Sequence, residues 1–145
     1  MAERTGVVLA ELSESDLDVA AHLAAVQTPA VGAVASFVGT VRDHSPDAAG
    51  EVVTLEYSAH PDAGAALAAI AARVAARYDG VRLAVSHRVG VLAVGDVAIV
   101  AAAADAHRGV AFDACRALVE AVKAELPVWK KQVLADGSHT WVGSA

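Results

Sequence analysis

Three lysines gather at one corner of the sequence, in the stretch EAVKAELPVWKKQ at residues 120–132. Lys123 falls in the last turn of a predicted helix, and Lys130 follows a proline in extended chain, so a bend there would bring the two together. Strand alternation would place Gln132 on the side of Lys130 and Lys131 on the opposite side. A lysine beside another cation releases its proton more readily, which suits a general acid or base or an anion site. The same spacing also fits exposed lysines near a helix C-terminus.

A second basic group lies in DAHRGVAF at residues 105–112. His107 and Arg108 come at the start of a predicted helix, where free backbone N–H groups and the helix dipole favour an anion. The two basic side chains beside that helix start favour a phosphate ligand. An exposed polar first turn is the alternative.

Two further basic pairs close predicted strands. Arg42 and His44 follow the apolar segment FVGTV, and His87 and Arg88 stand in SHRVG near a turn. A basic pair at a strand end is common on protein surfaces, so the first pair carries weight only together with other cations. We interpret the second pair as a solvated strand end.

Other chemistry-bearing residues form no recognised pattern. The six histidines are scattered without HxxxH spacing or paired cysteines, so we expect no metal site and no cofactor. The sequence also has no GxGxxG, P-loop or GxSxG motif. Cys115 is the single cysteine, which excludes an intramolecular disulfide, and its apolar helical surroundings favour a buried, inert thiol.

Length and charge favour one domain without a basic surface. The 145 residues are most simply a single domain over 1–145, and the net charge of −6 argues against a nucleic-acid or acidic-membrane surface. Any anionic ligand must therefore meet a local basic cluster. The N-terminus does not have the pattern of a signal peptide, and the longest apolar stretch, 89–104, is too short to span a bilayer. We expect a soluble cytoplasmic protein.

The elements that must position these residues alternate between strands and helices. Strands are predicted over residues 5–10, 31–42, 51–57, 81–90, 96–104, 128–134 and 139–143, and helices over 16–26, 61–78 and 107–126. Ser15 is the expected cap of the first helix, Gly39 a possible bulge, and a short connection containing Gly95 joins the strands on either side of it. Strands in adjacent pairs predict an α+β fold with a largely antiparallel sheet and three main helices.

Five motifs in order carry a family resemblance. They are FVGTVRDH, LEYSAHPD, HRVGVLAVGD, AHRGVAFDAC and LPVWKKQ. Together they resemble the large, catalytic subunit of molybdopterin synthase over roughly residues 30–142. The resemblance implies a homodimer in which each copy binds a small ubiquitin-like sulfur carrier, giving a heterotetramer. The carrier ends in Gly-Gly with a thiocarboxylate, and two sulfur transfers turn the substrate, cyclic pyranopterin monophosphate, into molybdopterin.

The resemblance also assigns roles to individual residues. Lys123 and Lys130 match the family's catalytic lysines. The substrate-binding residues that it implies are Thr40, Val41, Arg42, His107, Arg108, Lys131 and Gln132. We hypothesise that Lys123 transfers a proton at the pterin carbon where sulfur adds, while Lys130 stabilises developing negative charge. Arg42, His107 and Arg108 would then hold the phosphate.

One spacing bears on assembly. His107 and Lys123 are separated by 123 − 107 = 16 residues of one predicted helix, which is roughly 24 Å at about 1.5 Å per residue. That span is too long for one small substrate. If both groups serve one site, one of them must come from a second copy, which predicts a pocket shared across a homodimer. Two residues depart from the family pattern: Gln132 and Ser58 stand where relatives often have an acid.

Two other functions remain open from the sequence. The lysine corner could dock a partner's acidic C-terminal tail without doing chemistry, which predicts carrier binding but no product. The chain could also be a plain oligomeric α+β protein with solvated lysines, which predicts no carrier binding.

Overall fold

The structure, a computed structural model, describes residues 6–46 and 48–143 of the chain. The elements in order are β1 (Gly6–Ser13), α1 (Val19–Val26), β2 (Ala33–Thr40), β3 (Val52–Ala59), α2 (Ala63–Ala75), β4 (Arg82–Arg88), β5 (Gly90–Ala93), β6 (Val97–Asp105), α3 (Arg108–Glu125), β7 (Val128–Leu134) and β8 (His139–Val142). Within these residues, every helix is too short or too polar to cross a bilayer.

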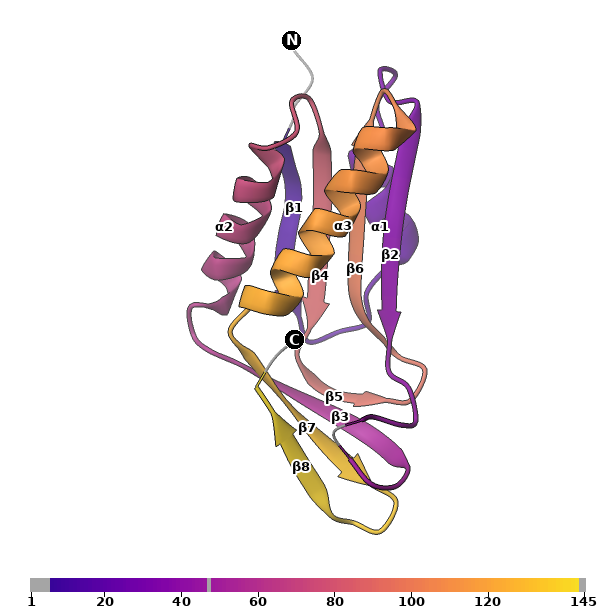
Figure 1. Cartoon of the computed structure of the whole chain (residues 1–145), viewed down its shortest axis with the longest axis vertical. Coiled ribbons are helices and arrows are strands. Elements are labelled where there is room, and N and C mark those ends of the chain that lie inside the picture. Colours follow the sequence, from indigo (N-terminus) through magenta and orange to yellow (C-terminus); the bar gives the residue numbers. More distant parts are fainter. Residues whose placement is uncertain (1–5, 47, 144–145) are drawn as a thin grey trace.

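The strands form two sheets, one above the other in Figure 1. Sheet A has the order β1-β4-β6-β2, and its β1–β4 pair is parallel while the others are antiparallel. Sheet B has the order β5-β3-β7-β8 and is antiparallel throughout. The predicted α+β fold with three helices and mostly antiparallel strands is confirmed, although the strands divide between two sheets.

Strand β5 was not predicted, because the sequence there reads as a short connection. Gly90 has a φ of 94°, a conformation that glycine adopts without strain and that turns the chain out of sheet A. The residues from Gly90 to Ala93 then pair with β3 of sheet B. One chain segment thus links the two sheets directly.

Helices cover both faces of sheet A. In Figure 1, α2 and α3 lie in front of the sheet and α1 lies behind it. The larger core fills the space under α2 and α3, and a smaller one lies under α1 around Val26 and Ala84. The central strand β6 carries consecutive alanines from Ala101 to Ala104 that are fully buried, and their small side chains let helices pack closely on both faces.

Helix α1 starts later than predicted. Asp18 is its N-cap and accepts a hydrogen bond from the Ala21 backbone N–H at 3.0 Å. The predicted cap, Ser15, instead donates its own backbone N–H to Ser13 Oγ at 3.1 Å and so belongs to the turn after β1. Helix α2 is likewise shorter at both ends than the predicted 61–78.

Two local features direct side chains toward the junction of the sheets. The first is the end of α3, where Leu126 is the C-cap and Pro127 stops the helix, so that β7 begins at Val128. The second is the predicted bulge of β2 at Gly39, where the register with β6 shifts. A Cβ at Gly39 would lie 2.6 Å from Ile99 Cγ2, so a larger residue there would force Ile99 or the strand to shift.

Candidate functional site

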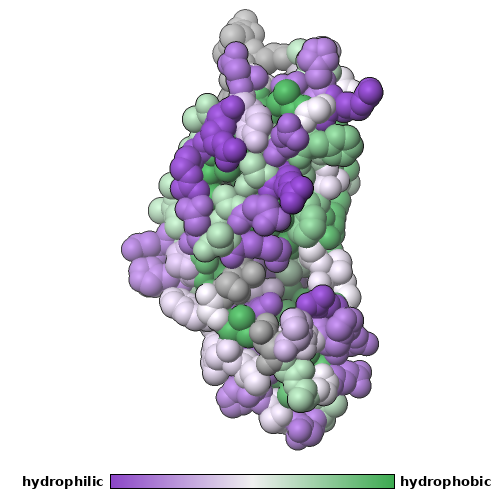
Figure 2. Space-filling model, viewed as in Figure 1, coloured by the Kyte–Doolittle hydropathy of each residue, from purple (hydrophilic) through white to green (hydrophobic). Residues whose placement is uncertain are grey.

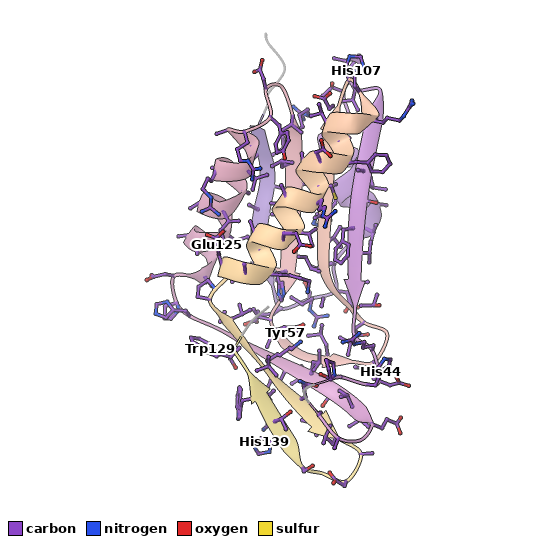
Figure 3. The ribbon with its side chains drawn as sticks, viewed as in Figure 1. His44, Tyr57, His107, Glu125, Trp129 and His139 are labelled. Atoms are coloured by element: carbon purple, nitrogen blue, oxygen red, sulfur yellow. The ribbon has the colours of Figure 1, made fainter. Side chains whose placement is uncertain are left out.

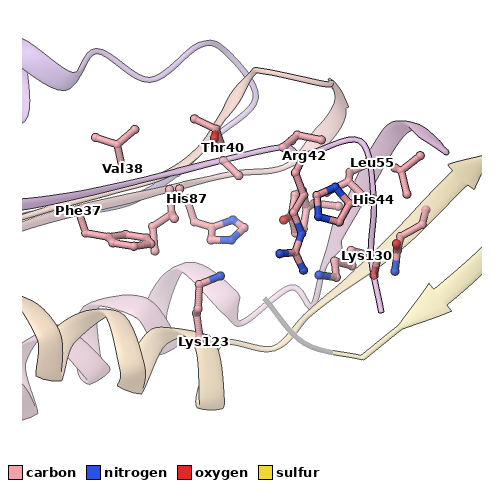
Figure 4. Close-up of a pocket in the computed structure, with 17 residues that line it drawn as sticks. Phe37, Val38, Thr40, Arg42, His44, Leu55, His87, Lys123 and Lys130 are labelled. Carbon is pink, nitrogen blue, oxygen red and sulfur yellow. The ribbon is translucent and has the colours of Figure 1, made fainter. Parts of the chain in front are cut away.

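A cavity of about 420 Å³ opens where the two sheets and the end of α3 meet. Its lining residues come from β2 and the loop after it, from β3 and β7 of sheet B, from β4 and β6 of sheet A, and from α3. Figure 4 shows the side chains of His87, Lys123, Arg42 and Lys130 facing one space. The cavity is therefore built by segments far apart in the sequence, and we call it the junction pocket.

Besides His87, which is described below, four basic side chains line the junction pocket. They are Lys123 of α3, Lys130 of β7, and Arg42 and His44 from the chain after β2. Figure 4 shows Lys123 on one side and Arg42 with Lys130 on the other. In a chain of net charge −6, this grouping makes a local site for an anion.

Three more of the expected site residues line the pocket. Thr40 and Val41 contribute from the end of β2 and beyond, and Gln132 contributes from β7. Val41 is anchored by two backbone hydrogen bonds to the chain before β6, namely its N–H to the Asp96 carbonyl at 2.9 Å and its carbonyl to the Gly95 N–H at 2.8 Å. These bonds hold the segment that carries Arg42.

Lys131 lies outside the junction pocket, on the opposite face of β7 from Lys130. Its Nζ is 5.9 Å from the centroid of the Trp141 ring on β8, which is a cation–π distance. The strand alternation expected from the sequence therefore holds. Lys131 is on the face of sheet B that carries Trp141, and it does not line the junction pocket.

His107 and Arg108 are also absent from the junction pocket. His107 is the N-cap of α3 and Arg108 its first helical residue, at the opposite end from Lys123. Figure 3 shows His107 at the far end of the molecule from Tyr57 and His44, which belong to the pocket. Of the three predicted phosphate ligands, one chain alone brings Arg42 to the lysines but not His107 or Arg108.

Gln132 presents a buried donor to the pocket. Its side chain is 1% exposed, and within the described residues its Nε2 has no hydrogen-bond partner. A buried amide N–H without an acceptor costs about 1–3 kcal/mol. Because Gln132 lines the junction pocket, we expect its amide to donate to a ligand oxygen there.

Replacing Gln132 with leucine should therefore separate stability from binding. We expect the free energy of unfolding to stay unchanged or to rise by about 1 kcal/mol, because the unsatisfied donor disappears. Affinity for an anionic substrate should fall about tenfold, because a charge-assisted hydrogen bond is lost. Urea denaturation and calorimetric titration measure the two quantities, and unchanged affinity would contradict the assignment of the amide to ligand binding.

His87 and Arg88 are buried, so their interpretation as a solvated strand end was wrong. They are 1% and 6% exposed. Arg88 donates from Nη1 to Asp16 Oδ1 at 3.0 Å and from Nη2 to the Glu14 carbonyl at 3.3 Å. The His87 ring meets the Tyr57 ring edge-on, with 4.9 Å between centroids. Strand β4 lies inside sheet A, and sheet B covers its end.

The His87 ring is held neutral by its surroundings. Its Nδ1 lies 2.7 Å from the Arg88 carbonyl oxygen. The pKa of His87 is lowered from 6.5 to about 4, first because burial disfavours the charged ring. The bond to the Arg88 carbonyl opposes this shift, and the charge of Lys123 adds to it. The ring faces the junction pocket as an uncharged group at neutral pH.

This lowered pKa makes the stability of the protein depend on pH. Between pH 6.5 and about 4, the unfolded chain binds a proton at His87 that the folded chain does not, so the free energy of unfolding falls as the pH is lowered. Between pH 7 and pH 5 the fall due to His87 is about 2 kcal/mol. Urea denaturation of the wild type and of His87→Gln at both pH values should show this difference. Equal losses in the two proteins would exclude His87 as the cause.

Tyr57 and Cys115 are two further buried groups. Tyr57 lines the junction pocket, and burial raises the pKa of its hydroxyl. Tyr57 is two residues after Leu55 in LEYSAHPD, so the strand pattern predicts that both side chains face inward. Nothing in the sequence shows that Tyr57 meets His87. Cys115 is buried, as predicted, and burial raises the pKa of its thiol, which keeps it in the unreactive protonated form.

Within the described residues, no group of three or more His, Cys, Asp or Glu side chains is placed to hold a metal ion.

Comparison with known proteins gives consistent matches. The family model described as MoaE protein matches residues 12–125. Molybdopterin synthase catalytic subunit 1 of Mycobacterium tuberculosis is 43% identical over 133 residues, covering 91% of this chain and 88% of that protein. The catalytic subunit of Bacillus subtilis is 34% identical over 134 residues, covering 92% of this chain and 83% of that protein.

Solved structures show the same fold. Molybdopterin synthase from Staphylococcus aureus has a TM-score of 0.85 and 28% identity, covering 92% of this chain and 96% of that chain. A complex of subunits 1 and 2 of molybdopterin-converting factor from Helicobacter pylori has a TM-score of 0.67 at 18% identity, covering 94% of this chain and 89% of that chain. The second match bears on the fold alone.

Proposed function

This chain belongs to the MoaE protein family, and from that membership we propose how its junction pocket carries out the work of a molybdopterin synthase catalytic subunit. The chain is a sulfurtransferase of molybdenum cofactor biosynthesis. It moves sulfur from the C-terminal thiocarboxylate of a small carrier protein to cyclic pyranopterin monophosphate, forming the dithiolene of molybdopterin.

The observation that carries the proposal is the grouping of Lys123, Lys130 and Arg42 in one pocket of an acidic protein. Both reactants are anions, since the substrate carries a cyclic phosphate and the carrier tail ends in a thiocarboxylate. Positive charge in a partly enclosed site attracts both and screens their mutual repulsion. The junction pocket is thus suited to bringing two like-charged reactants together.

The two lysines have different roles in this proposal. Lys123 transfers a proton at the pterin carbon to which sulfur adds, because it projects from α3 into the pocket on a flexible side chain (Figure 4). Lys130 stabilises the negative charge that develops on oxygen during the transfer. The Gln132 amide donates a further hydrogen bond to a ligand oxygen. Thr40 and Val41 shape the entrance beside Arg42.

A second copy of the chain completes the phosphate site. Strand β2 is at the edge of sheet A, and the large side chains exposed along it and on α3 beside it are Val34, Phe37, Val38 and Phe112. Figure 2 shows hydrophobic surface along that flank of the molecule. Exposed apolar side chains beside an open strand edge are typical of an interface. Because Phe37 and Val38 also line the pocket, a second copy seated there can bring its own His107 and Arg108 to Arg42.

Lys131 belongs to a different surface in this proposal. Its Nζ lies over the Trp141 ring, 5.9 Å from the centroid, and it does not line the junction pocket. We propose that Lys131 contacts the carrier protein at the rim of the pocket and does not bind the substrate. The carrier is a separate small ubiquitin-like chain ending in Gly-Gly, and two carriers with two copies of this chain form a heterotetramer in the cytoplasm.

Reconstitution tests the proposed function. The protein is mixed with a thiocarboxylated carrier and cyclic pyranopterin monophosphate, and the dithiolene product is followed by mass spectrometry. Product that depends on both reactants supports the proposal. Carrier binding without product would instead identify a docking module, and absence of both binding and product would leave only the fold in common with the catalytic subunits.

A further inference from the structure

His87 is a buried titratable group of the junction pocket for which the proposed mechanism has no use. It is at the end of β4, with its ring on the face of sheet A that α3 covers. Its neighbour Ser86 is on the opposite face, where its Oγ lies 2.6 Å from His22 Nε2 of α1. Because successive side chains of a strand point to opposite faces, His87 faces the pocket.

The tautomer of His87 follows from its hydrogen bond. A backbone carbonyl only accepts hydrogen bonds, so the Nδ1 atom 2.7 Å from the Arg88 carbonyl carries the proton. In the neutral ring the other nitrogen, Nε2, then bears a lone pair. The ring plane is fixed at 85° to that of Tyr57. His87 therefore offers a hydrogen-bond acceptor in a fixed orientation inside a pocket otherwise dominated by donors.

The groups that face His87 come from four elements. They are Lys123 of α3, Tyr57 of β3, Lys130 of β7, and Arg42 with His44 from the chain after β2. Figure 4 shows the Lys123 side chain rising from α3 toward the His87 ring, with Arg42 and Lys130 on the far side of the pocket. Lys123 is also the cation whose charge opposes protonation of His87. Its direction in Figure 4 places Lys123 to donate to Nε2.

We propose that His87 is a positioning residue, whose neutral Nε2 accepts a hydrogen bond from the Lys123 ammonium and holds that side chain where it meets the substrate. Lys123 is on the surface of the last turn of α3 and is exposed, so its long side chain has many rotamers without such a partner. An acceptor that stays neutral orients the ammonium without forming an ion pair, so Lys123 remains able to give its proton to the substrate. This inference rests on the proposed role of Lys123.

Three substitutions separate positioning from support of the fold. His87→Asn keeps a donor at the position of Nδ1, for the Arg88 carbonyl, but has no acceptor at the position of Nε2. His87→Gln keeps an acceptor at the longer reach of Nε2 and gives up the donor at Nδ1. His87→Phe keeps the ring and its contact with Tyr57 but has neither polar group. Circular dichroism and carrier binding establish that each variant is folded.

The turnover of each variant should depend on whether it has a hydrogen-bond acceptor at the position of His87 Nε2. In the reconstituted reaction we expect His87→Asn and His87→Phe to lower kcat about 100-fold with KM nearly unchanged, because a displaced catalytic group costs about that factor. His87→Gln should stay within about threefold of the wild type. The reverse order, with asparagine active and glutamine impaired, would show that only the bond to Arg88 matters and would overturn the proposal.

Nitrogen NMR of the wild-type protein tests the same point without any change at His87. At pH 7, the ring should show a protonated Nδ1 and an unprotonated Nε2, and Lys123→Met should shift the Nε2 signal while leaving Nδ1 in place. A protonated Nε2, or no response to Lys123→Met, would overturn the proposal even if every His87 variant failed to fold. The NMR result does not depend on turnover, so an inactive wild type would count against the proposed function and not against the contact.

Discussion

Replacing Lys123 with alanine should abolish product formation in the reconstituted reaction, with a loss of about 1,000-fold or more in kcat, because general acid–base groups contribute about 100- to 10,000-fold. The fold should survive the change. Lys123 is exposed in the last turn of α3, and a cation there adds only about 0.3–1 kcal/mol through the helix dipole. Carrier binding should persist, so the loss belongs to the chemical step.

Arg77→Ala is the matched control for that experiment. Arg77 is an exposed cation near the end of α2, over the Tyr78 ring and outside the junction pocket. The Arg77→Ala substitution removes one positive charge from the surface, as the Lys123→Ala substitution does, and it should leave turnover unchanged. Near-normal turnover of Lys123→Ala would remove this lysine from the mechanism, and equal losses in both variants would point to a general electrostatic effect.

A mixed dimer of two inactive variants should regain about half the activity of the wild-type dimer, because one of its two pockets then has all its native residues. Lys123→Ala and His107→Ala each disable both pockets of their own homodimer if each pocket takes Lys123 from one copy and His107 from the other. Coexpression with two different tags and tandem affinity purification isolates the mixed species. Product formation per dimer is the measurement.

The reciprocal mixed dimer is the control. A copy carrying both substitutions is paired with a wild-type copy, so that Lys123→Ala and His107→Ala are in the same chain of the dimer. Shared pockets predict that this dimer is inactive, since each pocket then lacks one group. Pockets contained within single chains predict the opposite in both experiments, namely an inactive first dimer and a half-active second one. The pair of results decides which arrangement is correct.

The parts of the site that could be predicted from the sequence depend on local geometry. Proline stops α3 and turns the chain, which placed Lys123 and Lys130 in one pocket. Strand alternation assigned Gln132 to the pocket and Lys131 to the other face. The rise of the helix over 16 residues predicted that His107 is far from Lys123. In each case the deciding distance spans a few residues or one regular element, so the pattern alone determines it.

The parts that could not be predicted depend on contacts between distant segments. The motif SHRVG has a polar pair at a strand end, and only the packing of Tyr57 from sheet B shows that His87 is inside. Strand β5 is four residues long and exists because β3 offers it a partner. Nothing within either segment specifies those partners, because they come from the way the two sheets meet.

The alanines at the centre of sheet A determine where flexibility remains when ligands bind. Alanine has no side-chain rotamers to lose, so the strand from Ala101 to Ala104 is already fixed in the empty protein. The wall of the junction pocket contributed by β6 continues directly from that strand. The ordering cost of binding then falls on the long cationic side chains, at about 0.5–1.5 kcal/mol for each one immobilised. Affinity is governed by how far Lys123, Lys130 and Arg42 are restrained before the ligand arrives, and the backbone contributes little to that entropy.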